Sequence, residues 1–129
     1  MSILKHSLNL SDGAKGATLI FAVTDFFEPF AKGGPKLGME VEEAQGINLA
    51  KAASKIPTLK HYIWSTLPNG NKISGGKYIV PHFEAKNQID DYIKSEPVLY
   101  AKTTFVWFTF FMSNLFFPMF TPNLVVSEP

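Results

Sequence analysis

His82 and Lys86 are the two residues whose types and spacing most clearly suggest chemistry. Four positions apart on a helix, they lie on one face, one turn from each other, together with Ile89 and Ile93. A histidine there could transfer a proton near neutral pH. The alternative is that Lys86 extends its charge to solvent along an apolar surface and His82 packs beside Pro81. The opposite face would carry the polar residues Glu84, Asn87, Gln88, Asp90, Asp91 and Lys94.

Ser65 and Thr66 are a second place where polar side chains meet a predicted strand. They directly follow the strand residues YIW. In parallel sheets the ligand crevice lies at the carboxyl ends of the strands, so these hydroxyls are expected to line it. They could equally be ordinary polar residues at the end of a strand.

An alternation of apolar runs and helical patterns positions these residues. Residues 17–24 form a continuous apolar run, as expected of a strand buried on both faces. We expect further strands at 59–67 and 103–108, helices at 39–56 and 82–95, and irregular loops at 25–38 and 68–76. This order predicts an α/β fold with parallel strands and right-handed crossovers. Three strands make a thin sheet, which suggests that part of the fold is absent.

Composition narrows the function classes. The 129 residues suggest one domain, 46% of them are hydrophobic, and the net charge of +1 gives no electrostatic case for binding nucleic acid. There is no cysteine, and the three histidines lack ligand spacing, so we expect no metal site.

Residues 105–120 are aromatic-rich but shorter than the ~20 residues of a membrane-spanning helix. We expect a buried strand and loop there, and a soluble protein of the cytoplasm.

Several strings resemble the NmrA-like family, an atypical branch of the short-chain dehydrogenase/reductase superfamily. They are FAVTDFFEPF at 21–30, EEAQGINLAKAA at 42–53, KHYIWSTLPNGNKISGGKYIVPHFEAKNQIDDYI at 60–93 and TTFVWFTFFMSNL at 103–115. The most specific stretch is SGGKY-x-VPHF-x-x-K. The resemblance implies a partial Rossmann-like NAD(P)-binding domain over residues 1–117, followed by an extended tail at 118–129. The expected architecture is a three-layer α/β/α fold whose parallel sheet lacks its first βαβ unit.

The resemblance also implies roles for the two candidate sites. In the wider superfamily a Tyr-x-x-x-Lys pair serves as acid and ribose-binding lysine, and here His82 and Lys86 occupy those positions. Ser65 matches the serine that polarises a carbonyl. The NmrA-like pattern further implies cofactor contacts by Lys86 and by a set spread over two strand ends: Thr24, Asp25, Phe26, Phe111 and Asn114. Phe26, and the apolar residues around Phe111, could instead belong to the core.

The diphosphate of a dinucleotide would need a glycine-rich turn between a strand and a helix. The Gly13-x-x-Gly16 pair precedes a strand, so that unit is expected to be missing. With strand 17–24 then at an unpaired apolar edge, we expect the chain either to self-associate along that edge or to be poorly soluble.

The leading functional hypothesis is an NADP- or NAD-dependent oxidoreductase acting on a small molecule. The strings IWSTLPN and FAVTDFFEPF look most like fungal members, many of which accompany secondary-metabolite biosynthesis. The alternative is a non-catalytic NAD(P)-binding protein that regulates a transcription factor in response to redox state, with a possible nuclear location. An inactive remnant is the third hypothesis.

Overall fold

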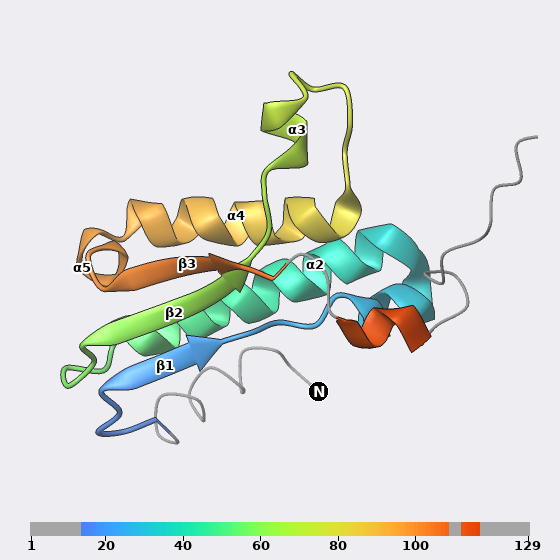
Figure 1. Cartoon of the computed structure of the whole chain (residues 1–129). Coiled ribbons are helices and arrows are strands. Elements are labelled where there is room, and N and C mark those ends of the chain that lie inside the picture. Colours follow the sequence, from blue (N-terminus) through green and yellow to red (C-terminus); the bar gives the residue numbers. More distant parts are fainter. Residues whose placement is uncertain (1–13, 109–111, 117–129) are drawn as a thin grey trace, which may run out of the picture.

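A computed structural model describes residues 14–108 and 112–116. Three parallel strands, β1 (Leu19–Ala22), β2 (His61–Thr66) and β3 (Thr103–Trp107), form one sheet in the order β1-β2-β3 (Figure 1). The remaining elements are helices: α2 (Phe27–Ser54), α3 (Gly70–Ile73), α4 (Pro81–Ser95), α5 (Pro97–Tyr100) and the short 3-10 helix η1 (Met112–Phe116). The predicted α/β class with a parallel sheet is confirmed.

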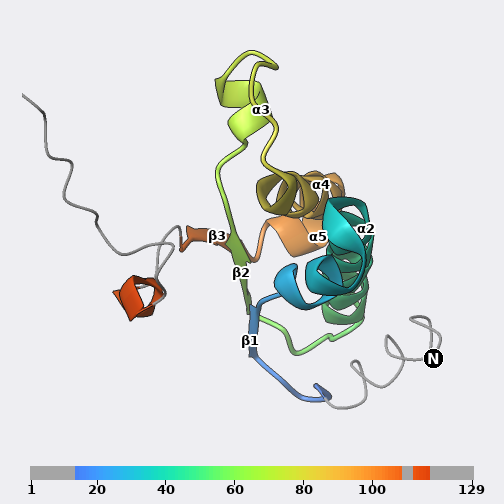
Figure 2. The same ribbon diagram turned by 90° about the vertical axis from the view of Figure 1, so that its right-hand side faces the viewer.

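Helices α2, α4 and α5 all cover the same face of the sheet (Figure 2). The described part of the chain therefore contains two of the three expected layers. None of the helices that the structure describes is long and apolar enough to span a bilayer.

The core lies between β2 and the paired helices α2 and α4. Tyr62 and Trp64 of β2 are fully buried, as are Ile89 and Ile93 of α4. The two helices pack tightly at Gly46 of α2, because a Cβ atom added there would lie 2.7 Å from Ile89 Cγ1. A larger residue at position 46 would have to displace a side chain that has no free space.

The expectation of an irregular loop at 25–38 was wrong, because α2 already begins at Phe27. The Asp25 carboxylate accepts hydrogen bonds from the backbone N–H groups of Phe27 (2.9 Å) and Glu28 (3.4 Å), which caps the helix. Pro29 is tolerated in the first turn, where its missing N–H has no partner to lose.

The Gly-Gly-Pro sequence that suggested a loop instead produces a kink within α2. Gly33 and Gly34 leave the helical conformation, and Gly34 has a φ of 77°, which favours glycine. Pro35 then begins the second helical stretch, again at a position whose N–H needs no acceptor.

Strand β1 is not buried on both faces, contrary to the expectation from its composition. Leu19 and Phe21 are 55% and 53% exposed, and Ala22 alone in the strand is buried. The aromatic stretch after Thr103 is likewise more open than expected, with Trp107 at 60% and Phe116 at 89% exposure. Both differences arise because no α-helix of the described residues packs on the second face of the sheet, where only the short 3-10 helix η1 lies. The expected tail at 118–129 lies outside the described residues.

The loop expected at 68–76 contains the short helix α3, which projects from the body of the molecule (Figure 1). The Asn69 side chain accepts a hydrogen bond from the Lys72 backbone N–H at 2.7 Å. Gly75 and Gly76 both have positive φ angles and close the following turn.

We predict that Gly46→Ala lowers the free energy of unfolding by about 1–3 kcal/mol, because the added methyl group overpacks the contact with Ile89. Urea unfolding measures this change. Gly70→Ala is the matched control, since the nearest side-chain atom to its added Cβ is 3.8 Å away. Equal stability of Gly46→Ala and the wild-type chain would contradict the close packing of α2 on α4.

Candidate functional site

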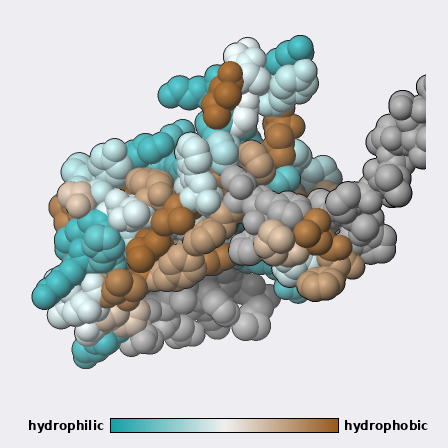
Figure 3. All heavy atoms as spheres, viewed as in Figure 1, coloured by the Kyte–Doolittle hydropathy of each residue, from teal (hydrophilic) through white to brown (hydrophobic). Residues whose placement is uncertain are grey.

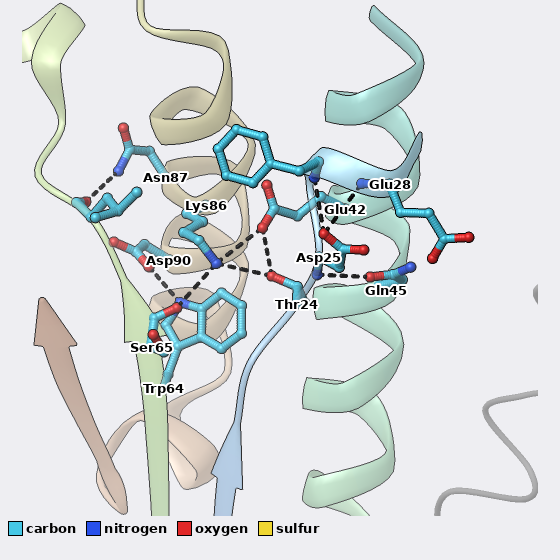
Figure 4. A network of polar contacts seen from close by, with 12 residues as sticks. Thr24, Asp25, Glu28, Glu42, Gln45, Trp64, Ser65, Lys86, Asn87 and Asp90 are labelled. Carbon is cyan, nitrogen blue, oxygen red and sulfur yellow. Dashed lines mark hydrogen bonds and ion pairs between the residues drawn. The ribbon is translucent and has the colours of Figure 1, made fainter. Parts of the chain in front are cut away.

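Four residues from four segments meet around the amino group of Lys86, and we call them the Lys86 cluster: Thr24, Glu42, Ser65 and Lys86 (Figure 4). Lys86 Nζ lies 3.0 Å from Glu42 Oε1 and donates hydrogen bonds to Thr24 Oγ1 at 3.0 Å and to the Ser65 carbonyl oxygen at 3.4 Å. The Thr24 hydroxyl in turn donates to Glu42 Oε1 at 2.7 Å. These contacts join the four residues into one network around one positive charge, in which Glu42 Oε2 has no hydrogen-bond partner among the described residues.

The fold brings these groups together from distant parts of the sequence. Thr24 follows the carboxyl end of β1, and Ser65 is the second-to-last residue of β2. Glu42 comes from the middle of α2 and Lys86 from the first half of α4. The cluster therefore lies at the strand ends where parallel α/β sheets bind their ligands.

The Lys86 ammonium is almost completely enclosed. Its side chain is 12% exposed and that of Glu42 is fully buried. The ring of Trp64 lies 5.2 Å from Nζ, close enough for a cation–π interaction. An ammonium group has three N–H donors, and the three oxygen acceptors use all of them. The alternative that Lys86 extends to solvent is therefore wrong. Its ammonium group points inward because it pairs with the buried carboxylate of Glu42.

Two further buried polar contacts involve the same helix. Trp64 Nε1 donates to Asp90 Oδ1 at 2.7 Å, and Asn87 Nδ2 donates to the Leu67 carbonyl oxygen at 2.9 Å. Burial raises the pKa of Asp90, and the neighbouring side chains of Thr66 and Trp64 partly offset this. Asn87 and Asp90 were expected on the solvent face, and that expectation was wrong, because α4 packs against β2 as well as α2 and so buries a wider face.

His82 lies within a group of aromatic rings. Its ring centroid is 5.8 Å from that of Phe26, 5.7 Å from that of Phe27 and 4.7 Å from that of Phe83. Burial lowers the pKa of the His82 imidazole, with smaller opposing effects of Glu42, which raises it, and Lys86, which lowers it. The imidazole is therefore mostly neutral at pH 7.

Asp25 and Phe26 have structural roles beside the cluster. Asp25 caps α2, and its backbone N–H donates to the Gln45 side-chain oxygen at 3.3 Å. Phe26 is buried and packs over Gly38, where an added Cβ would come within 2.8 Å of its ring. The packing alternative for Phe26 is thus supported, while cofactor contacts by either residue stay a prediction.

The structure does not bring Asn114 to the Lys86 cluster. Asn114 belongs to η1, which lies on the other side of the sheet from α2 and α4 (Figure 2). Phe111, the other residue expected near the nicotinamide, lies outside the described residues. Within the described ranges, no three His, Asp or Glu side chains converge in a way that could hold a metal ion.

Glu42 is the member of the cluster that sequence reasoning missed. One signal was present: Glu42 falls in the same i, i+4 row as Gly38, Gly46 and Ala50, all of which are buried. A carboxylate in a row of small, buried residues implies a buried partner of opposite charge.

Parallel strands joined by helical crossovers, with a polar cluster at their carboxyl ends, define part of a Rossmann-like α/β fold. The sequence profile of the NmrA-like family matches residues 4–126. The chain therefore belongs to the NmrA-like family, as the motifs predicted.

The relatives are considerably longer than this chain. An NmrA-like family domain-containing protein of Dictyostelium discoideum is 40% identical over 55 residues, which cover 43% of this chain and 18% of the relative. The crystal structure of NmrA, described as a negative transcriptional regulator, matches with a TM-score of 0.61 and 25% identity, and a doubly substituted NmrA with 0.58 and 26%. Each match covers 82% of this chain and 28% of the NmrA chain.

We predict that NMR titration of the imidazole resonances gives His82 a pKa below its usual value of 6.5, because the ring is partly buried. Glu42→Gln removes the negative charge that raises this pKa and lowers it further. Glu84→Gln, on the same helix but outside the interactions that shift His82, is the control and leaves the pKa unchanged. A His82 pKa at or above 6.5 in the wild-type chain would show that the ring is hydrated or paired.

Proposed function

We propose that this chain forms the ribose and nicotinamide side of an NAD(P) site in an NmrA-like protein, and that the site binds nucleotide as a redox-responsive regulator without transferring hydride. The observation that carries this proposal is the Lys86 ammonium, held beside the Thr24 hydroxyl at the carboxyl ends of β1 and β2. In Rossmann-like sheets this is the position of the bound nucleotide.

The cluster fits the ribose of such a nucleotide. Thr24 and Lys86 supply a hydroxyl and a cationic donor, the groups that bind a diol. The contact of Lys86 with the Ser65 carbonyl, at 3.4 Å, is the longest of its three and is the one that a ribose hydroxyl would replace. The described residues have no glycine-rich turn directly between a strand end and a helix start, so they do not fit the diphosphate.

Two features favour binding over catalysis. Glu42 neutralises the charge of Lys86, which reduces the ability of that lysine to lower the pKa of a nearby acid. His82, in the position of the superfamily's tyrosine acid, has a lowered pKa and is surrounded by phenylalanine rings. The likeness to NmrA, described as a negative transcriptional regulator, supports the same choice. The protein partner would then be a transcription factor, and the location cytoplasmic or nuclear.

A second candidate function is oxidoreduction of a small molecule, as in fungal secondary-metabolite biosynthesis. It is favoured by the position of His82, which is only partly buried and stands one helical turn from Lys86. A bound substrate that displaced the phenylalanine rings could raise the pKa of His82 toward neutrality.

The test is calorimetric titration of NADPH and NADH into the 129-residue chain, with folding verified by circular dichroism. We expect binding that weakens at least about tenfold in the double variant Glu42→Met/Lys86→Met, because a charged hydrogen bond to the ribose is lost. The double substitution avoids leaving an unpaired charge in the core. Lys94→Met is the control, since Lys94 is half exposed at the other end of α4.

Absence of binding at millimolar nucleotide in the folded chain would contradict the proposal. The two candidate functions are separated by following NADPH absorbance with a panel of aldehydes and ketones. The regulator proposal expects no turnover above background in the wild-type chain. Turnover that is lost in His82→Phe would favour the oxidoreductase.

A further inference from the structure

Trp64 of β2 and Asp90 of α4 form a buried polar contact that the proposed binding of a nucleotide does not use. Trp64 is fully buried and Asp90 is 8% exposed. The Trp64 Nε1–H group donates to Asp90 Oδ1 at 2.7 Å, a short distance typical of a hydrogen bond to an ionised acceptor. The contact lies on the helical side of the sheet, whereas the opposite face is open and carries apolar residues (Figure 3).

A carboxyl group is a costly acceptor at this place. Burial raises the pKa of Asp90, because the charged form loses its hydration in the core. An apolar side chain of the same size would fill the space without that cost. The presence of a carboxyl group therefore points to a role for its oxygen atoms, and one of these accepts the indole N–H of Trp64.

The ring of Trp64 also contacts the Lys86 ammonium (Figure 4). Nζ lies 5.2 Å from the ring centroid, within the range of a cation–π interaction. Lys86 and Asp90 are four positions apart on α4, so they lie on one face, one turn from each other. An indole has a single N–H donor, so its hydrogen bond to Asp90 sets which way the ring is turned. Two side chains of α4 thus hold the indole.

The residue after Trp64 provides the contact that the ribose is proposed to replace. The Ser65 carbonyl oxygen accepts a hydrogen bond from Lys86 Nζ at 3.4 Å. The ammonium is therefore held between this carbonyl group, the indole ring and the Thr24 hydroxyl. A rotation of the ring would remove the cation–π contact and leave the ammonium free to move away from the ligand position.

We propose that Asp90 is a positioning residue of the Lys86 cluster and acts through Trp64. Its hydrogen bond holds the indole ring against the Lys86 ammonium, and the ring keeps the ammonium directed at the nucleotide hydroxyl. This inference rests on the proposed nucleotide site, although Asp90 itself does not touch the nucleotide.

The first test is NMR on the 129-residue chain without nucleotide, which measures Overhauser contacts between the Lys86 ε-methylene and the Trp64 ring protons. We expect Asp90→Leu to lose these contacts, because the indole N–H then has no acceptor. Asp90→Asn keeps them, since an amide oxygen accepts the same hydrogen bond. Asp90→Ser, which leaves room for water at the indole N–H, is expected to lose them too and replaces Asp90→Leu where that variant does not fold.

The second test is calorimetric titration of NADPH into the same variants. We expect Asp90→Leu to weaken binding about three- to tenfold, the loss of one cation–π contact, and Asp90→Asn to restore it. In a Trp64→Phe chain, Asp90→Leu causes no further loss, because the carboxyl group has no indole N–H to hold. Asp91→Leu is the matched control, since the Asp91 side chain is 77% exposed.

The two tests separate this inference from the proposed function. A folded wild-type chain that binds no nucleotide contradicts the proposed function, and the Overhauser contacts then decide the role of Asp90. The inference is overturned if Asp90→Leu keeps the contacts between Lys86 and Trp64, or loses them and binds NADPH as tightly as the wild-type chain. It is also overturned if Asp90→Asn loses the contacts as fully as Asp90→Leu.

Discussion

Glu42 of α2 and Lys86 of α4 are buried against each other at 3.0 Å, where the carboxyl ends of β1 and β2 meet the two helices. Moving two charges out of water is costly, and their attraction compensates only when the remaining donors and acceptors are also satisfied. Here the Thr24 hydroxyl and the Ser65 carbonyl satisfy the ammonium, whereas Glu42 Oε2 has no hydrogen-bond partner among the described residues. The position of β1 relative to α4 depends on this contact, because Thr24 joins the strand end to both charges.

The same contact limits what the site can do. A lysine with its charge neutralised and all three donors used is a poor activator of a proton donor, but it can exchange its weakest contact for a ligand hydroxyl. His82, one turn away, is held among phenylalanine rings that favour its neutral form. These features are the basis of the proposal that the site binds a ribose. The chain spans 28% of the length of the NmrA structure that it matches.

Much of the fold could be predicted from the sequence, because three apolar runs indicated the strands and the spacing of apolar residues indicated an amphipathic helix at 82–95. Strands β2 and β3 and helix α4 lie within a few residues of the expected positions. The spacing of Lys86 with Ile89 and Ile93 also predicted that all three residues share one face of the helix. The parts that could not be predicted depend on tertiary contacts. The start of α2 was missed because Gly33, Gly34 and Pro35 are typical of a loop. The exposure of β1 could not be predicted because it depends on which elements cover the strand.

Glu42 shows why the site was only partly predictable. Lys86 alone suggested either a functional or a solvent-exposed lysine, and the residue that pairs with its charge in the core lies 44 positions earlier in the sequence, on another helix. Only the packing of α2 on α4, through the close contact of Gly46 with Ile89, brings the two charges together. The charge pair is therefore a property of the assembled helices, whereas the His82–Lys86 spacing is local.

A double-mutant cycle on Glu42 and Lys86 tests most directly whether the fold depends on their contact. The cycle compares urea unfolding of the wild-type chain, Glu42→Met, Lys86→Met and the double variant. Each single variant leaves one buried charge unpaired, so we expect a loss of about 3–5 kcal/mol from each and a double variant much more stable than their sum implies. The exposed pair Asp91–Lys94 on α4 is the reference cycle, with a coupling of at most about 0.5 kcal/mol. Additive effects of the Glu42 and Lys86 substitutions, to within about 0.5 kcal/mol, would contradict the buried ion pair and the account of the site built on it.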